Sequence, residues 1–245
     1  MNTSFLDIAK ISAGYGDGDV IHDISLQVQS GETFGLIGLN GAGKTTLIKT
    51  ILGLKDASDG TISIAGAQSG STEAKKQLAF LPERFEPAWF LNAYEFIAFT
   101  LKLYGEAPDN QKADAMAEKL GLKVSYLSKR AQTYSKGMRQ KLGLMATFLT
   151  SCPLLILDEP MSGLDPLARA QVKGILQDAK AQGRTVFLSS HILSDMEELC
   201  DRVGIIHNGT IAFVGKPGDL LLQNQETQLE GAFLKLIGKD LSRAA

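Results

Sequence analysis

The sequence predicts an α/β protein with a mainly parallel sheet, an antiparallel β subdomain and an all-helical insertion. Apolar runs at residues 33–37, 154–157 and 185–188 are short and uninterrupted, which is typical of parallel strands covered on both faces. Helical segments lie between these runs, and such strand–helix alternation favours a parallel α/β core. The first thirty residues instead alternate between apolar and polar side chains, and residues 88–150 have helical periodicity.

The composition excludes several classes of protein before any motif is considered. The 245 residues are 44% hydrophobic and 21% charged, which is typical of globular chains rather than disordered ones. With a net charge of −2, the chain lacks the overall positive charge that attracts nucleic acids, so no nucleic-acid partner is expected. The two cysteines provide neither a disulfide framework nor a four-cysteine metal site. Because there is no apolar run of about 18 residues and no signal-peptide pattern, we expect a cytosolic protein.

The first part of the chain contains a predicted hairpin and a strand that leads into a glycine-rich loop. Residues 24–28 alternate apolar and polar, as in a half-buried strand. Glycine and aspartate residues at 16–19 indicate the turn before this strand. The apolar strand at 33–37 runs into the loop, and a helix is expected over residues 46–52, ending near Gly53.

Two further short strands are expected at residues 61–66 and 78–81, before the helical insertion. Within the insertion, helical spacing predicts two amphipathic helices, one with Phe96, Phe99, Leu101 and Leu103, the other with Ala113, Met116, Ala117 and Leu120. Gly121 is a typical residue to end the second of them.

The two buried strands after the insertion are followed by a helix at residues 193–200 and a strand at 203–206. Asn208 and Gly209 then lie between two apolar runs, which strongly indicates a type I′ hairpin. The chain is therefore expected to return to β structure near its C-terminal end.

A glycine-rich sequence lies between the strand at 33–37 and the helix after it. It matches the pattern G-x-x-x-x-G-K-[ST] in full and comprises Gly38, Leu39, Asn40, Gly41, Ala42, Gly43, Lys44 and Thr45. The glycines allow backbone N–H groups to converge on phosphate oxygens, and the helix N-terminus adds a partial positive charge. Lys44 can reach the β- and γ-phosphates of ATP, the Thr45 hydroxyl can ligate Mg²⁺, and Thr46 is included among the predicted nucleotide contacts.

Two consecutive carboxylates follow the buried strand at 154–157. Asp158 and Glu159 are therefore expected at the C-terminal edge of the parallel sheet, where ligands of such folds bind. We predict that Asp158 belongs to the Mg²⁺ shell, opposite Thr45, and that Glu159 activates water. The alternative, an acidic pair that caps a helix, carries less weight beside a phosphate loop. Together the two motifs predict a P-loop NTPase core and leave kinases, GTPases, helicases and transport ATPases open.

A third motif separates these classes. Residues 134–138, Tyr-Ser-Lys-Gly-Met, follow the helical insertion and resemble the signature sequence Leu-Ser-Gly-Gly-Gln of the ABC transporter ATPases. Ser135 and Gly137 are retained and can offer a hydroxyl and an unobstructed N–H to a phosphate, whereas the first, third and fifth positions differ. Without the family, Ser135 would be interpreted as an ordinary helix N-cap. The resemblance covers nearly the whole chain, from about residue 6 to residue 215.

The resemblance implies further site residues. Asp165 is similar to the D-loop aspartate of the family, and His191 to its switch histidine. Tyr15 matches the aromatic residue that stacks on adenine. Glu83 stands where the family usually has a glutamine; an ionised carboxylate only accepts hydrogen bonds, but it can still ligate Mg²⁺. We therefore expect function to survive with an altered metal or pH dependence.

The resemblance also implies the domain organisation. A single ABC ATPase domain is expected, with a nucleotide-binding core at about residues 5–84 and 151–215. The helical subdomain would cover about residues 85–150, and residues 216–245 would form a C-terminal extension.

What the resemblance implies for function is an ATP-hydrolysing subunit that powers transport through a separate integral membrane partner. The signature, Glu83 and the residues at 229–236 resemble the exporter-type branch, so export is expected rather than import. The protein would lie on the cytoplasmic face of the membrane. Each ATP would lie between the phosphate loop of one chain and the signature of a second ATPase subunit, either a copy or a related chain. Aromatic residues after Glu83, including Trp89 and Phe90, would suit a docking helix of the membrane partner.

Two other classes of protein stay open. One is a soluble ABC-type ATPase that acts on the ribosome or on DNA; such proteins generally have two ATPase units, or coiled-coil or zinc insertions, which this sequence lacks. The other is a P-loop kinase or GTPase, in which residues 134–138 would match the signature by chance.

Overall fold

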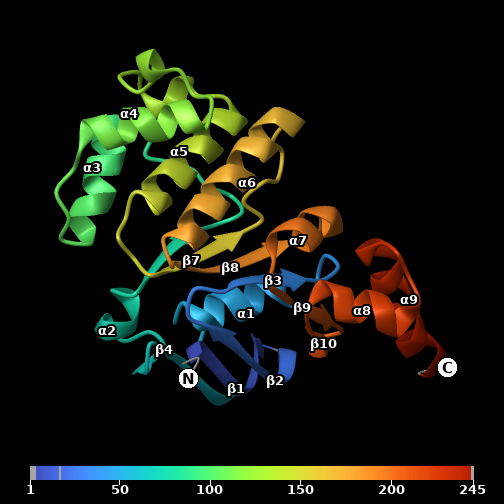
Figure 1. Cartoon of the computed structure of the whole chain (residues 1–245). Coiled ribbons are helices and arrows are strands. Elements are labelled where there is room, and N and C mark those ends of the chain that lie inside the picture. The colour runs from blue at the N-terminus through green and yellow to red at the C-terminus, as the bar shows by residue number, and fades with distance from the viewer. Residues whose placement is uncertain (1–3, 17, 244–245) are drawn as a thin grey trace.

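The computed structural model describes residues 4–16 and 18–243 and contains the predicted parallel sheet (Figure 1). Its strands are β3 (Thr33–Ile37), β6 (Leu78–Leu81), β7 (Leu154–Asp158), β8 (Thr185–Ser190), β9 (Arg202–His207) and β10 (Thr210–Gly215). Within the described residues, these six strands have the order β10-β9-β3-β8-β7-β6. The paired strands are parallel, apart from the antiparallel hairpin of β9 and β10. The hairpin turn is the one predicted, with positive φ angles of 48° at Asn208 and 75° at Gly209.

A smaller antiparallel sheet confirms the predicted β subdomain. In the part of the chain that the structure describes, it consists of β1 (Ser4–Tyr15), β2 (Gly18–Gln29), β4 (Asp59–Ile64) and β5 (Ala67–Gln68), in the order β2-β1-β4-β5. The strand predicted at 61–66 ends before Ala65, because this residue and Gly66 have positive φ angles of 50° and 80° and form a turn. Of the predicted turn at 16–19, Asp17 lies outside the described residues.

The region between β6 and β7 is helical, as predicted, and lies to one side of the sheets in Figure 1. It contains α3 (Ala93–Leu103), α4 (Asn110–Lys119) and α5 (Lys136–Phe148), with short 3-10 turns at Val124–Tyr126 and Ala131–Thr133. A capping box of Asn92 and Glu95 starts α3, and Gly121, with a φ angle of 61°, follows α4 in the left-handed conformation. An isolated β-bridge between Asn92 and Arg130 is an addition that helical periodicity does not indicate.

Other helices cover the sheets or extend the chain beyond them. They are α1 (Lys44–Ile51), α2 (Thr72–Lys75), α6 (Pro166–Ala181), α7 (Leu193–Leu199), α8 (Pro217–Asn224) and α9 (Leu229–Arg243). The helix predicted at 46–52 begins earlier, at Lys44, and the short α2 was not predicted. Of the predicted C-terminal extension, residues 244–245 lie outside the described part. Among the described residues, no helix is both long and apolar enough to cross a membrane.

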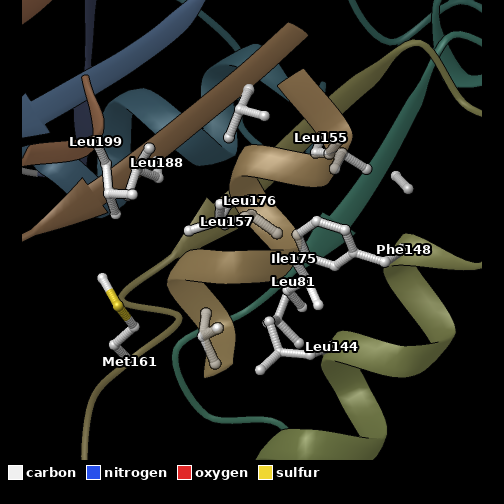
Figure 2. Packing of buried hydrophobic residues seen from close by; sticks show 14 of the residues in the cluster. Leu81, Leu144, Phe148, Leu155, Leu157, Met161, Ile175, Leu176, Leu188 and Leu199 are labelled. Carbon is white, nitrogen blue, oxygen red and sulfur yellow. The ribbon is translucent and has the colours of Figure 1, made fainter. Parts of the chain in front are cut away.

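The parallel sheet is buried on both faces, which explains why its strands are continuous apolar runs. Neighbouring residues of β7 belong to different hydrophobic clusters, with Leu155 in one and Leu154 in the other. Figure 2 shows how the cluster that contains Leu155 is covered by α5 and α6, whose residues Leu144 and Ile175 pack towards β7. Both helices thereby hold their N-terminal ends in a defined place relative to the strands.

The parallel register brings the carboxyl ends of three strands to one edge of the sheet. Ile37 at the end of β3 pairs with Ser190 at the end of β8, and Asp158 at the end of β7 pairs with Ser189. The glycine-rich loop, the acidic pair and His191 therefore begin at the same edge, although they lie far apart in the sequence.

Phe187 tests this packing, because it is fully buried in β8 and its ring stacks on that of Phe34 at a centroid distance of 5.7 Å. The substitution Phe187→Ala leaves a cavity between the sheets, and we expect the free energy of unfolding to fall by about 3–5 kcal/mol. Urea denaturation followed by circular dichroism measures the change. The control Leu222→Ala removes a side chain that is 80% exposed and should change the free energy by less than about 0.5 kcal/mol. A loss as small as that of the control would contradict the described core.

Candidate functional site

The glycine-rich loop joins β3 to α1 and leaves the N-terminus of α1 open. Gly43 has a φ angle of 111°, and a Cβ atom there would lie 2.5 Å from Cγ2 of Ile21, so the position requires glycine. Gly43 is also the N-cap residue of α1, and it has no side chain to occupy the N–H groups of the first turn. These N–H groups and the helix dipole make the loop a site for an anion.

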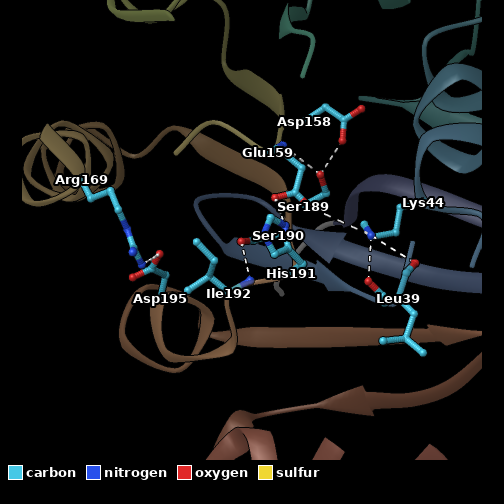
Figure 3. Close-up of polar contacts among 11 residues, drawn as sticks. Leu39, Lys44, Asp158, Glu159, Arg169, Ser189, Ser190, His191, Ile192 and Asp195 are labelled. Atoms are coloured by element: carbon cyan, nitrogen blue, oxygen red, sulfur yellow. Dashed lines mark hydrogen bonds and ion pairs between the residues drawn. The ribbon is translucent and has the colours of Figure 1, made fainter. Parts of the chain in front are cut away.

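Lys44 is the buried cation of this loop, with only 8% of its side chain exposed. Its Nζ donates to the carbonyl oxygen of Gly38 at 2.7 Å and lies 4.0 Å from Oε1 of Glu159 (Figure 3). The ammonium group is therefore held between the loop and the acidic pair, at the place where phosphate oxygens would enter.

Ser189 links the two acidic residues at the end of β7. Its hydroxyl donates to Oδ1 of Asp158 at 2.5 Å and accepts the N–H of Glu159 at 3.0 Å. Glu159 has a φ angle of 49°, a strained conformation for a residue with a Cβ atom, and this hydrogen bond helps to hold it. The fully buried Ser189 thus fixes the carboxylate of Asp158 and the backbone of Glu159 (Figure 3).

His191 contacts the second of these carboxylates. Its Nδ1 lies 2.8 Å from Oε2 of Glu159, and because an ionised carboxylate only accepts hydrogen bonds, Nδ1 carries the hydrogen. The Glu159 side chain is 8% exposed, whereas the imidazole is 55% exposed. Glu159 therefore lies between Lys44 and His191, and three of the residues predicted to be catalytic form one contiguous group.

The surroundings of Asp158 fit a divalent cation. Burial raises the pKa of Asp158 above its usual value; hydrogen bonds from Ser189 and Thr45 lower it, and the Glu83 carboxylate raises it further. A cation bound here would lower the pKa of Asp158, because it favours the ionised forms of both carboxylates. The Asp158 and Glu83 carboxylates and the Thr45 hydroxyl are the hard oxygen ligands that Mg²⁺ prefers, so the donor set fits this ion.

Most of the predicted site residues line one pocket, whose volume is about 420 Å³. Its walls include Tyr15, Leu39, Asn40, Gly41, Gly43, Lys44, Thr45, Thr46, Glu83, Asp158, Glu159 and His191. Gly38 and Ala42 belong to the loop but not to this wall. Tyr15 is half exposed, and Nζ of Lys55 lies 4.9 Å from the centre of its ring. An exposed aromatic ring at the pocket leaves a face on which a flat base can stack.

Besides Gly38 and Ala42, three predicted residues lie outside the pocket wall: Ser135, Gly137 and Asp165. The Ser135 hydroxyl accepts the N–H of Met138 at 3.2 Å and caps α5, as the simpler interpretation of this serine expects. Asp165 accepts the N–H of Ala168 at 2.8 Å and caps α6. Within one chain these side chains are helix caps, and their predicted roles towards ATP stay predictions that need a second chain.

Sequence reasoning missed two residues of the site. Ser189 carried a signal, because it is a hydroxyl residue at the buried end of an otherwise apolar strand. Val20 lines the pocket from β2. It gave no signal, because β2 and the other walls of the pocket are distant in the sequence.

Comparison with known proteins agrees with this geometry. A sequence profile described as ABC transporter matches residues 21–162. An ABC transporter ATP-binding protein of Synechocystis sp. is 39% identical over 89% of this chain and 63% of its own length. The Nod factor export ATP-binding protein I of Rhizobium leguminosarum bv. viciae is 32% identical over 96% of this chain and 75% of its own length. A solved structure of the ATP binding subunit of an ABC transporter has a TM-score of 0.89 and 34% identity, covering 96% of this chain and 100% of that one.

The chain spans about 63% of the length of two cyanobacterial relatives, from Synechocystis and Nostoc, so those proteins are longer than this sequence. The matched profile nevertheless contains the glycine-rich loop, the signature and the acidic pair in one stretch. The sequence similarity, the fold and the site agree, and the chain belongs to the ABC transporter family of ATP-binding proteins.

Proposed function

We propose that this chain binds and hydrolyses ATP and thereby powers transport, in the direction of export, through a separate integral membrane subunit. The observation that carries the proposal is the pocket in which Glu159 lies between Lys44 and His191, beside the open N-terminus of α1. A phosphate loop alone would suit any nucleotide-binding protein. A buried carboxylate held by a histidine adds the means to activate water against a phosphoryl group.

In the proposed reaction, the N–H groups of the loop and Lys44 bind the β- and γ-phosphates and stabilise the charge of the transition state. Glu159 accepts the proton of the attacking water. His191 donates Nδ1–H to the other oxygen of that carboxylate and keeps it in position through the 2.8 Å contact. The strained backbone of Glu159, held by Ser189, directs the carboxylate into the pocket.

Other residues would bind the remaining parts of the nucleotide. Tyr15 offers its exposed ring to the adenine base. Thr45, Asp158 and Glu83 would hold Mg²⁺, which would supply a Lewis acid that offsets the negative charge of the phosphates. Glu83 would serve as a metal ligand only, because a carboxylate has no N–H with which to orient the water.

A second ATPase subunit completes the proposed site. Ser135 and Gly137 lie at the N-terminus of α5, a 13-residue helix whose dipole favours an anion, but they do not line the pocket of their own chain. A head-to-tail pair would place Ser135 and Gly137 on the γ-phosphate bound by the partner, while Asp165 would provide the D-loop aspartate. Such a pair is isologous, so it forms two equivalent sites.

The proposed membrane partner would dock beside Glu83. Trp89 and Phe90 follow it and are 63% and 53% exposed, with their rings edge to face at 5.6 Å. Two exposed aromatic rings six and seven residues after the proposed metal ligand Glu83 suit a partner helix and would link its movement to the site. The partner would hold this chain at the cytoplasmic face of the membrane. Export is supported by the relative whose name describes Nod factor export.

Co-purification tests the choice between transport and the alternative, a soluble ABC-type ATPase that acts on the ribosome or on DNA. Recovery of the tagged chain with an integral membrane protein supports transport. Recovery with ribosomes or DNA, and without a membrane protein, would favour the alternative.

The first functional prediction concerns Lys44. The substitution Lys44→Ala removes the buried cation from the phosphate position, so ATPase activity should fall about 10²- to 10³-fold. The fold should survive, because Lys44 contacts the loop rather than the apolar core. A steady-state ATPase assay beside thermal unfolding checks both points. The control Lys112→Ala removes a lysine that is 76% exposed on α4 and should retain full activity, and normal turnover in Lys44→Ala would reject the site.

The second prediction concerns sharing of sites between two chains. Lys44→Ala damages the half-site that binds phosphate, and Ser135→Arg damages the signature half-site. Mixing the two variants can form one intact composite site and one doubly damaged site, so part of the ATPase activity should return. Each variant mixed with itself is the control. Absence of recovery, with pairing confirmed by light scattering, would count against shared sites.

The third prediction concerns Glu159. Glu159→Gln keeps the size of the side chain but cannot accept the proton, so single-turnover hydrolysis should fall about 10²- to 10⁴-fold while ATP binding is preserved. The ATP-bound pair should accumulate in size-exclusion chromatography with Mg²⁺-ATP, because ligand bound across the interface stabilises it. Asp158→Asn is the matched control and should weaken Mg²⁺ binding instead. Hydrolysis by Glu159→Gln near the rate of the unmodified chain would reject the role as base.

A further inference from the structure

Helix α7 begins two residues after His191, so the place of this helix determines the place of the imidazole. Its N-cap residue, Ile192, has no side chain that could cap the helix. The Ser190 hydroxyl accepts the N–H of Ile192 at 3.0 Å and bonds the backbone at this turn. A helix of seven residues is not stable by itself, so its neighbours must hold it.

Asp195, in the first turn of α7, has a buried carboxylate that pairs with two cations of α6. Its side chain is 2% exposed, and one of its oxygens lies 2.6 Å from Nη2 of Arg169 (Figure 3). The other oxygen lies 2.9 Å from Nζ of Lys173. Arg169 and Lys173 are four residues apart and share one face of α6. Lys173 also pairs with Glu198, one turn further along α7.

Lys173 remains charged in this network. Burial lowers the pKa of Lys173, but hydrogen bonds to Glu198 and Asp195 outweigh burial, and the pKa is raised above its usual value. The cations on the two oxygens of the Asp195 carboxylate offset the free-energy cost of burying its charge, and removing them would leave a buried charge without a partner. The contact therefore holds α6 and α7 in one register.

The network joins the two sides of the site. Helix α6 follows Glu159 through the short loop at 160–165, and Arg169 lies near its start. Helix α7 follows His191, and Asp195 lies near its start. The first turns of the two helices are thus connected at the ends that lead back to the Glu159–His191 contact.

We infer that Asp195 is a positioning residue, whose ion pairs with Arg169 and Lys173 hold α7 against α6 and thereby hold His191 on the carboxylate of Glu159. The catalytic consequence rests on the proposed function, in which Glu159 accepts the proton of the attacking water. The geometric part, that Asp195 determines where the imidazole lies, is independent of the reaction.

The test compares Asp195→Asn with a matched control on the same helix. Asp195→Asn keeps the size of the side chain but removes its charge; we expect kcat for ATP hydrolysis to fall about 10- to 100-fold, because a small displacement of a catalytic group has an effect of this size. The KM for ATP should stay within about twofold, because no group that binds ATP is touched. The control Asp178→Asn removes a half-exposed partner of Lys119 near the far end of α6 and should change neither constant.

A double-mutant cycle separates positioning from general destabilisation. After His191→Ala, a positioning residue has nothing left to hold, so Asp195→Asn should reduce kcat little further. Asp195→Glu, which keeps the charge, should recover part of the rate. Equal effects of Asp195→Asn with and without His191, or a loss that appears in KM rather than kcat, would overturn the proposal.

A spectroscopic measurement keeps the proposal distinct from the proposed function. The chain has three histidines, so the imidazole ¹⁵N signals of His191 can be assigned with His191→Ala. Asp195→Asn should shift these signals, and Asp178→Asn should not. If the unmodified chain does not hydrolyse ATP, the proposed function fails, and the signals still decide the positioning role; unshifted signals in Asp195→Asn overturn it. Should Asp195→Asn not fold, Arg169→Gln is measured in the same way, because Asp195 keeps Lys173 as a partner there.

Discussion

The parallel register of β3, β7 and β8 is the constraint on which the rest of the site depends. Parallel strands that lie side by side end at the same edge, so the loop after Ile37, the pair at Asp158 and the turn at Ser190 meet there. Burial of both faces of the sheet enforces this register, because a shift by one residue would exchange Leu154 and Leu155 between two packed clusters. The chemistry therefore follows from the packing of the apolar runs.

The site itself holds groups that packing alone would not favour. Two adjacent carboxylates, Asp158 and Glu159, are buried, and the backbone of Glu159 has a positive φ angle. Ser189 provides the hydrogen bonds that direct both residues, and the ammonium group of Lys44 lies near the second. The buried acidic pair and the strained backbone persist because the surrounding strands hold them in place. Such groups are typical of a site that binds a charged ligand.

The helices after the acidic pair connect the site to more distant parts of the chain. Helix α6 covers the cluster that includes Leu176 and presents its cations to α7, while α9 packs on α7 from the other direction. The N–H of Leu229 at the start of α9 donates to the Glu197 carboxylate of α7 at 3.2 Å. The helix that follows His191 is consequently held by both the central core and the C-terminal helices.

The sequence by itself determined the elements that depend on neighbours along the chain. The glycine-rich loop, the apolar strands, the Asn208–Gly209 turn and the helical insertion were predictable, because backbone conformation and amphipathic period are local properties. The residues of the glycine-rich loop and the acidic pair were predictable from local motifs, whereas the roles of Tyr15, Glu83 and His191 came from the resemblance to the ABC transporter ATPases. Only the tertiary structure decided that Ser189 bonds Asp158 and Glu159, and that Asp195 pairs with α6. Those contacts depend on which strands become neighbours and on how two helices are rotated, and both are set by packing between segments that no local pattern relates.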